Sequence, residues 1–277
     1  MRNVSIVRGV AFPALTVLLL AAIGDTEPQR REGRGGLLQQ GFRNPPYDGQ
    51  FRFCRIMFRS SGYGDGNGWS VDYPRADVNF TFRLSELTTT TVSRASGGDF
   101  NHVVLRLTDA ELYRCPFIML TEPGGAYFDE DEASHLRDYL LKGGFLWADD
   151  FWGEYAWNAW VGELRKALPS GVYPIADLPP DHPIFHMLYE VRELPQIPSI
   201  NFWGGTGGQT SERGSDSAVP HARGVSDANG RMIVLMTHNT DFGDAFERET
   251  DNRTNFDRFA SEGYAFGVNV LLYALTH

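Results

Sequence analysis

The 277-residue sequence lacks the features of a nucleic-acid-binding, zinc-binding or polytopic membrane protein. It has 25 Lys and Arg against 35 Asp and Glu, a formal net charge of −10, and no basic stripe, so we expect no nucleic-acid partner. Its two cysteines form no Cys-x-x-Cys pattern and therefore no zinc site. No internal repeat is found, and the longest apolar run falls short of the roughly 20 residues that a membrane-spanning helix needs. The length suits one large domain with a buried core.

The N-terminus has the pattern of an export signal. Arg2 and Arg8 precede the apolar stretch Gly9–Ile23, which ends in small residues suited to a signal peptidase. We therefore expect residues 1–24 to be a signal peptide, with an uncleaved membrane anchor as the alternative. Either alternative predicts an exported protein of the periplasm or cell envelope. The polar residues 25–48 are typical of a flexible linker, and the folded domain should occupy residues 49–277.

The two cysteines, Cys54 and Cys115, each stand at the start of a predicted strand. They could lie close together at one edge of a sheet, and an oxidising compartment would permit a disulfide. The alternative is a pair of buried free thiols. The sequence leaves this choice open.

The pattern of apolar residues predicts a doubly wound, mostly parallel α/β sheet. Residues 117–168 alternate strand, helix, strand, helix, as in a parallel sheet with crossover helices. Asp129 and Glu132 have the spacing of a capping box at the start of the first of these helices. The predicted core strands are 54–58, 117–121, 145–148 and 233–236.

Several separated motifs resemble the DUF4159 family of uncharacterised bacterial proteins. The resemblance runs from Phe51 to the end of the chain and implies a class I glutamine amidotransferase-like, flavodoxin-like fold outside a membrane. Family relatives also suggest envelope partners, namely a MoxR-type ATPase and von Willebrand-type proteins, but neither a reaction nor a cofactor. The motifs are 72–77, 116–124, 136–153, 181–185 and 273–277.

The nucleophile of an amidotransferase is missing. Acyl transfer by that chemistry needs a cysteine in the sharp turn after a central strand. The comparable turn, residues 148–153, contains neither Cys nor Ser, and both cysteines stand at the opposite ends of strands. We therefore expect no glutaminase activity.

Polar residues follow three predicted strands: Glu122, the pair Asp149 and Asp150, and His238 with Asn239. Because ligands bind beyond the carboxyl ends of strands in such sheets, we expect these residues to converge in one crevice and to include any ligand-binding or catalytic groups. The alternatives are structural: Glu122 would bond the turn that follows it, and His238 would be a satisfied structural histidine.

The adjacent pair Asp149 and Asp150 is the most suggestive feature, since carboxylates can hold a metal, exchange a proton or bind sugar hydroxyls. Because side chains alternate along a strand, we expect one of the two to face the crevice and the other to cap the helix that starts near Glu154. Asp149, His238 and Asp241 are candidate metal ligands, although no fixed spacing supports them.

Two aromatic residues extend the candidate site. Trp152 could stack on a sugar beside the aspartates. Tyr63 lies in a glycine-rich loop, 61–68, which lacks the phosphate-binding patterns and could cover the crevice. Just after this loop, Asp72 is expected to join Arg75 and Asp77 in a structural ion-pair cluster.

Three functions fit these observations. The first is a non-catalytic exported domain that binds a small molecule, a sugar or a protein partner. The second is a carboxylate-dependent hydrolase or carbohydrate-active enzyme, assisted or not by a metal. The third is a structural component of an envelope assembly. The sequence identifies no cofactor and does not decide whether the protein is an enzyme.

Overall fold

A computed structural model describes residues 42–277 of the chain. The expected signal peptide and most of the expected linker lie outside the described residues. Among the helices of residues 42–277, none has the length and apolar character needed to cross a membrane.

A seven-stranded sheet forms the centre of the domain, in the order β3-β1-β4-β6-β9-β8-β7. The first five strands in this order are parallel, and β8 and β7 join antiparallel at one edge. A separate antiparallel pair joins β2 (Arg59–Ser60) and β5 (Ala126–Tyr127). The strands of the large sheet are β1 (Phe53–Ile56), β3 (His102–Leu105), β4 (Phe117–Thr121), β6 (Phe145–Asp149), β7 (Ile175–Asp177), β8 (His221–Ser226) and β9 (Met232–His238).

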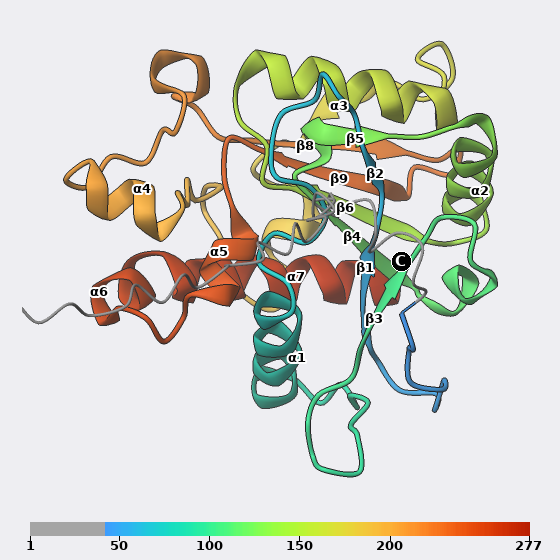
Figure 1. Ribbon diagram of the computed structural model, residues 1–277, viewed down its shortest axis with the longest axis horizontal. Helices are drawn as coiled ribbons and strands as arrows, with labels where there is room; N and C mark the ends of the chain where they lie inside the picture. Colours follow the sequence, from blue (N-terminus) through green and yellow to red (C-terminus); the bar gives the residue numbers. More distant parts are fainter. Residues whose placement is uncertain (1–41) are drawn as a thin grey trace, which may run out of the picture. The chain divides into compact units, whose positions relative to one another are not determined.

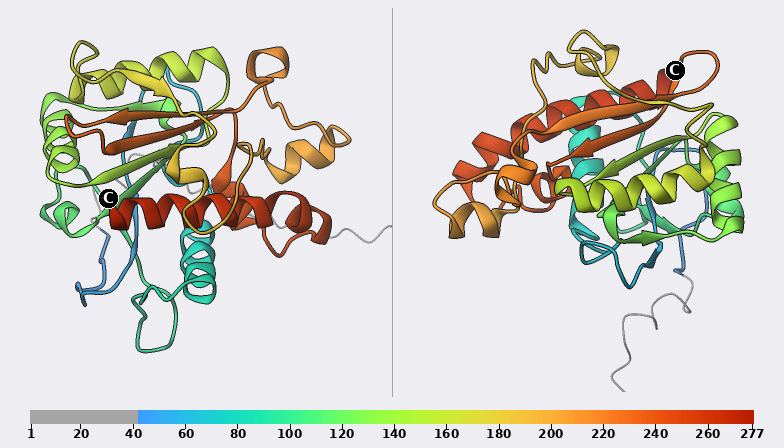
Figure 2. Two further views of the ribbon diagram at one scale, coloured as in Figure 1. Left: turned by 180° about the vertical axis from the view of Figure 1, so that it is seen from behind. Right: turned by 90° about the horizontal axis from the view of Figure 1, so that it is seen from above.

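Helices cover both faces of this sheet (Figures 1 and 2). Helices α1, α5 and α7 pack on one face, where Trp147 of β6 contacts the rings of Phe242, Phe246 and Phe266. Helices α2 and α3 pack on the other face, where Trp160 lies against Phe128. The helices are α1 (Arg75–Leu87), α2 (Glu130–Leu141), α3 (Gly153–Ala167), α4 (Ile200–Gly205), α5 (Phe242–Glu247), α6 (Arg253–Asn255) and α7 (Ser261–Thr276).

The predicted doubly wound, mostly parallel fold is confirmed. The four predicted core strands correspond to β1, β4, β6 and β9, with ends that differ by a few residues. The capping box is also present, because the Asp129 carboxylate accepts from the Glu132 amide and the Glu132 carboxylate accepts from the Asp129 amide. The antiparallel edge formed by β8 and β7 was not predicted.

The strand order defines where the chain changes direction across the sheet. From β1 the chain passes through α1 to β3 on one side, and then returns to β4 on the other side of β1. The carboxyl ends of β1 and β4 therefore flank a topological switch point, where open α/β sheets bind their ligands. The loop after β1 and the turn after β4 both lie at this edge.

A buried arginine organises the switch point. Arg55 of β1 is fully buried and its guanidinium bonds both carboxylate oxygens of Asp77 on α1. It also donates to the Thr121 hydroxyl of β4 at 2.7 Å and to two carbonyls of the loop that precedes α1, those of Trp69 and Val71. This side chain thus fixes β1, β4, α1 and the connecting loop relative to one another.

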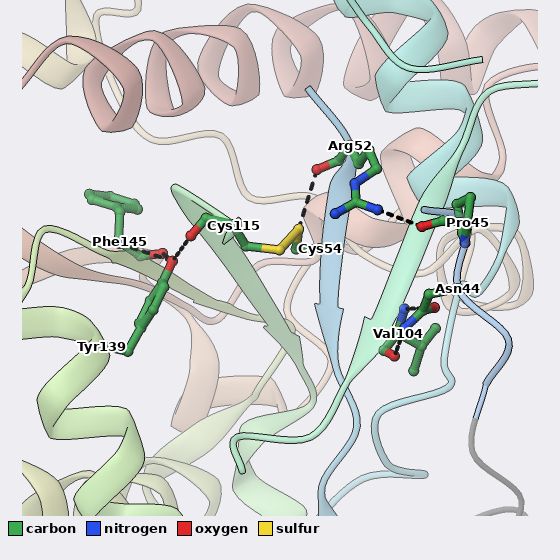
Figure 3. The surroundings of a disulfide bond; sticks show 8 residues. All are labelled: Asn44, Pro45, Arg52, Cys54, Val104, Cys115, Tyr139 and Phe145. Atoms are coloured by element: carbon green, nitrogen blue, oxygen red, sulfur yellow. Dashed lines mark hydrogen bonds between the residues drawn. A yellow bond between two sulfur atoms is a disulfide. The ribbon is translucent and has the colours of Figure 1, made fainter. Parts of the chain in front are cut away.

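Cys54 and Cys115 form a disulfide at the opposite ends of the same two strands (Figure 3). Their Cα atoms are 6.3 Å apart, and 61 residues separate them in the sequence. The Tyr139 hydroxyl of α2 donates to the Cys115 carbonyl at 2.8 Å, which fixes the start of β4 on the neighbouring helix. Of the two alternatives left open by the sequence, the structure has the disulfide.

Replacing both cysteines by alanine should lower the free energy of unfolding by about 2–4 kcal/mol, because the cross-link closes a long loop in the unfolded chain. Denaturant titration of the oxidised wild type and the double variant measures the difference. Reduction of the wild type should produce a similar loss. Equal stability of all three forms would contradict a structural role for the cross-link.

Candidate functional site

The ends of the three central strands meet at one edge of the sheet. The Glu122 amide after β4 donates to the Asp149 carbonyl of β6 at 3.0 Å, and the Asn239 amide after β9 donates to the Phe151 carbonyl at 2.9 Å. Thr121 also pairs in register with Asp149. The polar residues that the sequence singled out therefore belong to directly adjacent turns.

The backbone of these turns is strained in a common way. Glu122, Asp150 and Asn239, each at or just after the end of a strand, have φ values of 50°, 59° and 64°, in the left-handed region that L residues avoid. Asp72, in the loop before α1, has φ of 61°. These four are the non-glycine residues of positive φ within residues 42–277, and all carry polar side chains. Such strain costs on the order of 1–3 kcal/mol per residue and concentrates at functional sites.

A hollow of about 370 Å³ opens above these turns, and we call it the acidic crevice. It holds four carboxylates and one cationic side chain, Arg213, which bonds both oxygens of Asp65 at 3.1 Å. The remaining acids, Glu122, Asp150 and Glu212, have no cation of this lining against them. The lining residues are Asp65, Gly66, Asn67, Glu122, Asp150, Phe151, Trp152, Ala156, Glu212 and Arg213.

Asp150 is the aspartate of the pair that faces the crevice. Its Oδ1 accepts from the Trp152 indole N–H at 3.0 Å, which leaves Oδ2 available. Burial raises the pKa of Asp150 well above its ordinary value, and the charges of Glu122 and Asp72 add to this effect. A positively charged partner would therefore stabilise the ionised form of Asp150.

Asp149 points away from the crevice and holds the start of α5. Its Oδ1 accepts from the Thr237 hydroxyl at 2.5 Å, and its Oδ2 accepts from the backbone amides of Phe242 and Gly243 at 2.8 and 3.2 Å. Burial raises the pKa of Asp149 to about 7, against the effect of these hydrogen bonds. Asp149 is thus a structural residue.

The expectation that one aspartate caps the helix near Glu154 was wrong. At the start of α3 the Asn239 side chain accepts from the Gly153 amide at 2.8 Å, and Asp216 accepts from the Glu154 amide at 3.1 Å. The left-handed turn at Asp150 directs the chain so that Asp149 meets α5 instead.

Glu122 binds the glycine-rich loop, and not the turn that follows it. Its carboxylate accepts from the backbone amides of Asn67 and Gly68, the latter at 2.6 Å. Gly66 has φ of 98°, and a Cβ there would come within 2.8 Å of the Glu122 carboxylate. Burial raises the pKa of Glu122, and these hydrogen bonds oppose the rise. Glu122 therefore closes one wall of the crevice.

His238 lies outside the crevice. Its Nε2 lies 3.0 Å from the Gly153 carbonyl and its Nδ1 lies 3.3 Å from the Arg223 guanidinium, so a neutral ring donates at Nε2 and accepts at Nδ1. The ring packs against both Phe151 and Trp157, and burial lowers its pKa to about 4. The structure gives His238 the structural role that the sequence left as an alternative, and it does not join His238 to Asp149 and Asp241 in a metal site.

The two aromatic candidates differ in position. The Trp152 side chain lines the crevice with its N–H bonded to Asp150. The Tyr63 side chain is 89% exposed and is not part of the lining, so the expectation that it covers the crevice was wrong. The carbonyl of Tyr63 instead accepts from the Tyr155 hydroxyl, which attaches the loop to α3.

The sequence missed Glu212, Arg213 and Asp72. Glu212 and Arg213 come from a long connection after α4 that carries no motif, so only the fold brings them to the crevice. Asp72 was expected to pair with Arg75 and Asp77, but Arg75 bonds Asp251 and Asp77 bonds Arg55. Asp72 has a buried oxygen, Oδ2, that no hydrogen bond reaches.

The sequence was compared with known families and proteins. The family model described as a domain of unknown function, DUF4159, matches residues 57–275. This match agrees with the resemblance carried by the sequence motifs. No curated protein matched the chain.

Replacing His238 by Gln should reduce the loss of stability on acidification. A folded-state pKa of about 4, below the ordinary value of 6.5, means that the unfolded chain binds the proton more tightly. Wild-type stability should therefore fall as the pH drops from 7 to 5, by about 2 kcal/mol from this group. Denaturant titrations at pH 7 and pH 5 measure the free energy of unfolding of the wild type and the variant. If the variant loses as much free energy of unfolding as the wild type between these pH values, His238 is not a buried neutral residue.

Replacing Asp149 by Ala should destabilise the domain by about 2–4 kcal/mol, because the amides of Phe242 and Gly243 lose their acceptor in a buried site. Asp149→Asn keeps one acceptor oxygen and should therefore be destabilised less than the Ala variant. Thermal and denaturant unfolding measure both changes. An Ala variant as stable as the wild type would show that α5 does not depend on this carboxylate.

Proposed function

Because the chain belongs to the DUF4159 family, whose description names no reaction, we propose from the site itself that the domain is a non-catalytic binding module. Its ligand is a small molecule that donates hydrogen bonds and carries positive charge or several hydroxyl groups, such as an amine or an amino sugar. The ligand occupies the acidic crevice.

The composition of the crevice lining supports this proposal most directly. Three carboxylates, Glu122, Asp150 and Glu212, line a hollow of about 370 Å³ in which the single cationic side chain is already bonded to Asp65. Acceptors in excess favour a ligand that supplies donors or positive charge. The indole N–H of Trp152, a buried residue of the lining, donates to Asp150 and holds that carboxylate in place.

The way the carboxylates are held favours binding over catalysis. The lining contains no Ser, Cys, Thr, His or Lys that could act as a nucleophile beside a base. Glu122 is tied by two backbone amides and Asp150 by an indole N–H, so both are fixed as acceptors. These contacts favour the charged, accepting form of each carboxylate and oppose the rise in pKa that burial causes.

We also propose that the domain acts outside the cytoplasm. The disulfide between Cys54 and Cys115 supports this, since such bonds persist in oxidising compartments. The export signal expected in residues 1–24 supports it as well. Envelope protein partners of the kind implied by the family resemblance would be met there.

Thermal unfolding with millimolar glucosamine or spermidine, compared with glucose and glucuronate, tests the ligand class. Glucosamine or spermidine should raise the melting temperature, because a ligand that binds only the folded state stabilises it by mass action. Glucuronate, an anion, should leave it unchanged. Calorimetric titration of the ligand that gives the largest rise then measures the affinity.

Glu212→Gln is the informative variant, because it removes charge and keeps the oxygen that accepts from the Ser199 amide at 2.7 Å. It should weaken binding about tenfold, the usual effect of losing one charge-assisted hydrogen bond. Glu86→Gln, on the exposed surface of α1, is the matched control and should bind as the wild type does. Stabilisation by anions alone, or turnover of the ligand in the same samples, would overturn the proposal.

A further inference from the structure

We propose that Asp72, Asp150 and Asp241 bind one hard divalent cation, Ca²⁺ or Mg²⁺, at the carboxyl edge of the sheet. These residues, the aspartate triad, come from three separate loops: before α1, after β6 and before α5. The inference does not depend on the identity of any ligand of the acidic crevice, with which the triad shares Asp150.

The geometry of the triad suits a metal ion. Each residue offers one carboxylate oxygen, and these oxygens lie within 4.8 Å of one another. Calcium holds its oxygen ligands at roughly 2.3–2.6 Å, so oxygens on either side of an ion lie up to about twice that distance apart. Ligands that are all oxygen favour calcium or magnesium over zinc or copper.

The orientation of Asp72 is an independent indication. Asp72 is 9% exposed, and its Oδ2 has no hydrogen-bond partner. This atom and Asp241 Oδ1 flank the same backbone position, since a Cβ placed on Gly243 would lie 2.2 Å from Asp72 Oδ2 and 3.3 Å from Asp241 Oδ1. A buried carboxylate oxygen without a donor is costly, and a cation would remove that cost.

The other two aspartates each have an oxygen to offer. Asp241 uses Oδ1 to accept from the Asp244 amide at 2.7 Å, and Asp150 uses Oδ1 to accept from Trp152. The second oxygen of each carboxylate is then available to a metal. The first oxygens hold the two side chains in place, as contacts behind metal ligands commonly do.

Within residues 42–277, no Lys, Arg or His forms an ion pair or a hydrogen bond with a triad carboxylate. The positive charge that acts most strongly on Asp72 is that of Arg55. The Arg55 guanidinium, however, donates its hydrogen bonds to Asp77, to Thr121 and to two backbone carbonyls, and not to Asp72. The other charges that act most strongly on the triad, those of Asp149, Asp244, Glu247 and Glu122, are acidic. Burial, reinforced by these charges, raises the pKa of each triad carboxyl.

A second acid group shares Asp72 but is a weaker candidate. Asp72, Asp244 and Glu247 also bring carboxylate oxygens within 4.8 Å of one another. There, however, Arg248 contacts Glu247 at 2.7 Å, and Asp244 accepts from the Ile200 amide at 2.8 Å. The second group already pairs with Arg248, whereas no Lys or Arg of the described chain pairs with the triad.

Calorimetric titration of chelator-stripped full-length protein with CaCl₂ and with MgCl₂ at pH 7.5, without any organic ligand, tests the inference. At least one of the two should bind with a stoichiometry of one and raise the melting temperature. Asp72→Asn and Asp150→Asn should each weaken binding by about 100-fold or more. Both variants should remain as stable as the stripped wild type, because they remove repulsion among buried acids.

Two further variants make the test specific. Glu247→Gln should bind the cation as the wild type does. If Glu247→Gln loses cation binding and Asp150→Asn keeps it, the ion belongs to the second group and the inference is overturned. Glu212→Gln should also leave cation binding unchanged, which separates this result from that of the proposed ligand. If Asp72→Asn fails to fold, Asp241→Asn replaces it. Wild-type protein that binds neither cation would overturn the inference outright.

Discussion

The buried guanidinium of Arg55 determines how the functional edge of this domain is built. It stands in β1, beside the edge strand β3, and bonds α1, β4 and the loop that precedes α1, so that four parts of the fold share one side chain. A buried charge is tolerated only when every donor is satisfied, and here each contact serves that purpose. The carbonyl of Val71 is one of its acceptors, and Asp72 is the next residue. The position of Asp72 in the site thus depends on this arginine.

The carboxyl edge of the sheet has two features that lower the stability of the folded state and that a purely structural turn would not need. Polar residues hold left-handed backbone conformations at Asp72, Glu122, Asp150 and Asn239, and carboxylates are buried close to one another. Asn239 and Glu122 recover part of this cost through hydrogen bonds to neighbouring loops. Asp72 Oδ2 recovers none within the described chain. This lack of a hydrogen-bond donor distinguishes the aspartate triad from the structural acids around it and favours an external cation.

The sequence predicted the fold because local patterns and the global topology agree. Alternating strands and helices, the capping box at Asp129 and the apolar strands all follow from near-neighbour periodicity. The three polar strand ends are adjacent as expected, since parallel strands end at one edge, but of their residues only Glu122 and Asp150 line the crevice, and Asn239 bonds Gly153 and Val219 instead. β7 has three residues, none of them buried, and β8 has only Ala222, Gly224 and Val225 buried, so neither strand shows an apolar run. The disulfide depends on distances that spacing alone cannot supply.

The sequence could not predict which of two neighbouring residues lines the crevice and which one has a structural role. Asp149 and Asp150 look equivalent in sequence, but the left-handed turn at Asp150 sends one carboxylate to α5 and the other to the crevice. Asp72 lies beside Arg75, yet that arginine bonds Asp251. Glu212 and Arg213 are about 60 residues beyond Asp150 in the sequence and reach the crevice only through the tertiary fold.

An anomalous difference map from crystals grown at pH 7.5 and soaked in CaCl₂, or in MnCl₂ as a substitute for Mg²⁺, would locate the cation directly. We expect a peak in at least one of the two maps, at about 2.0–2.6 Å from one carboxylate oxygen of each of Asp72, Asp150 and Asp241. Two empty maps, with these oxygens at hydrogen-bonding distance from one another, would show that shared protons, and not a cation, balance the buried acids. In that case the triad would not be a cation site.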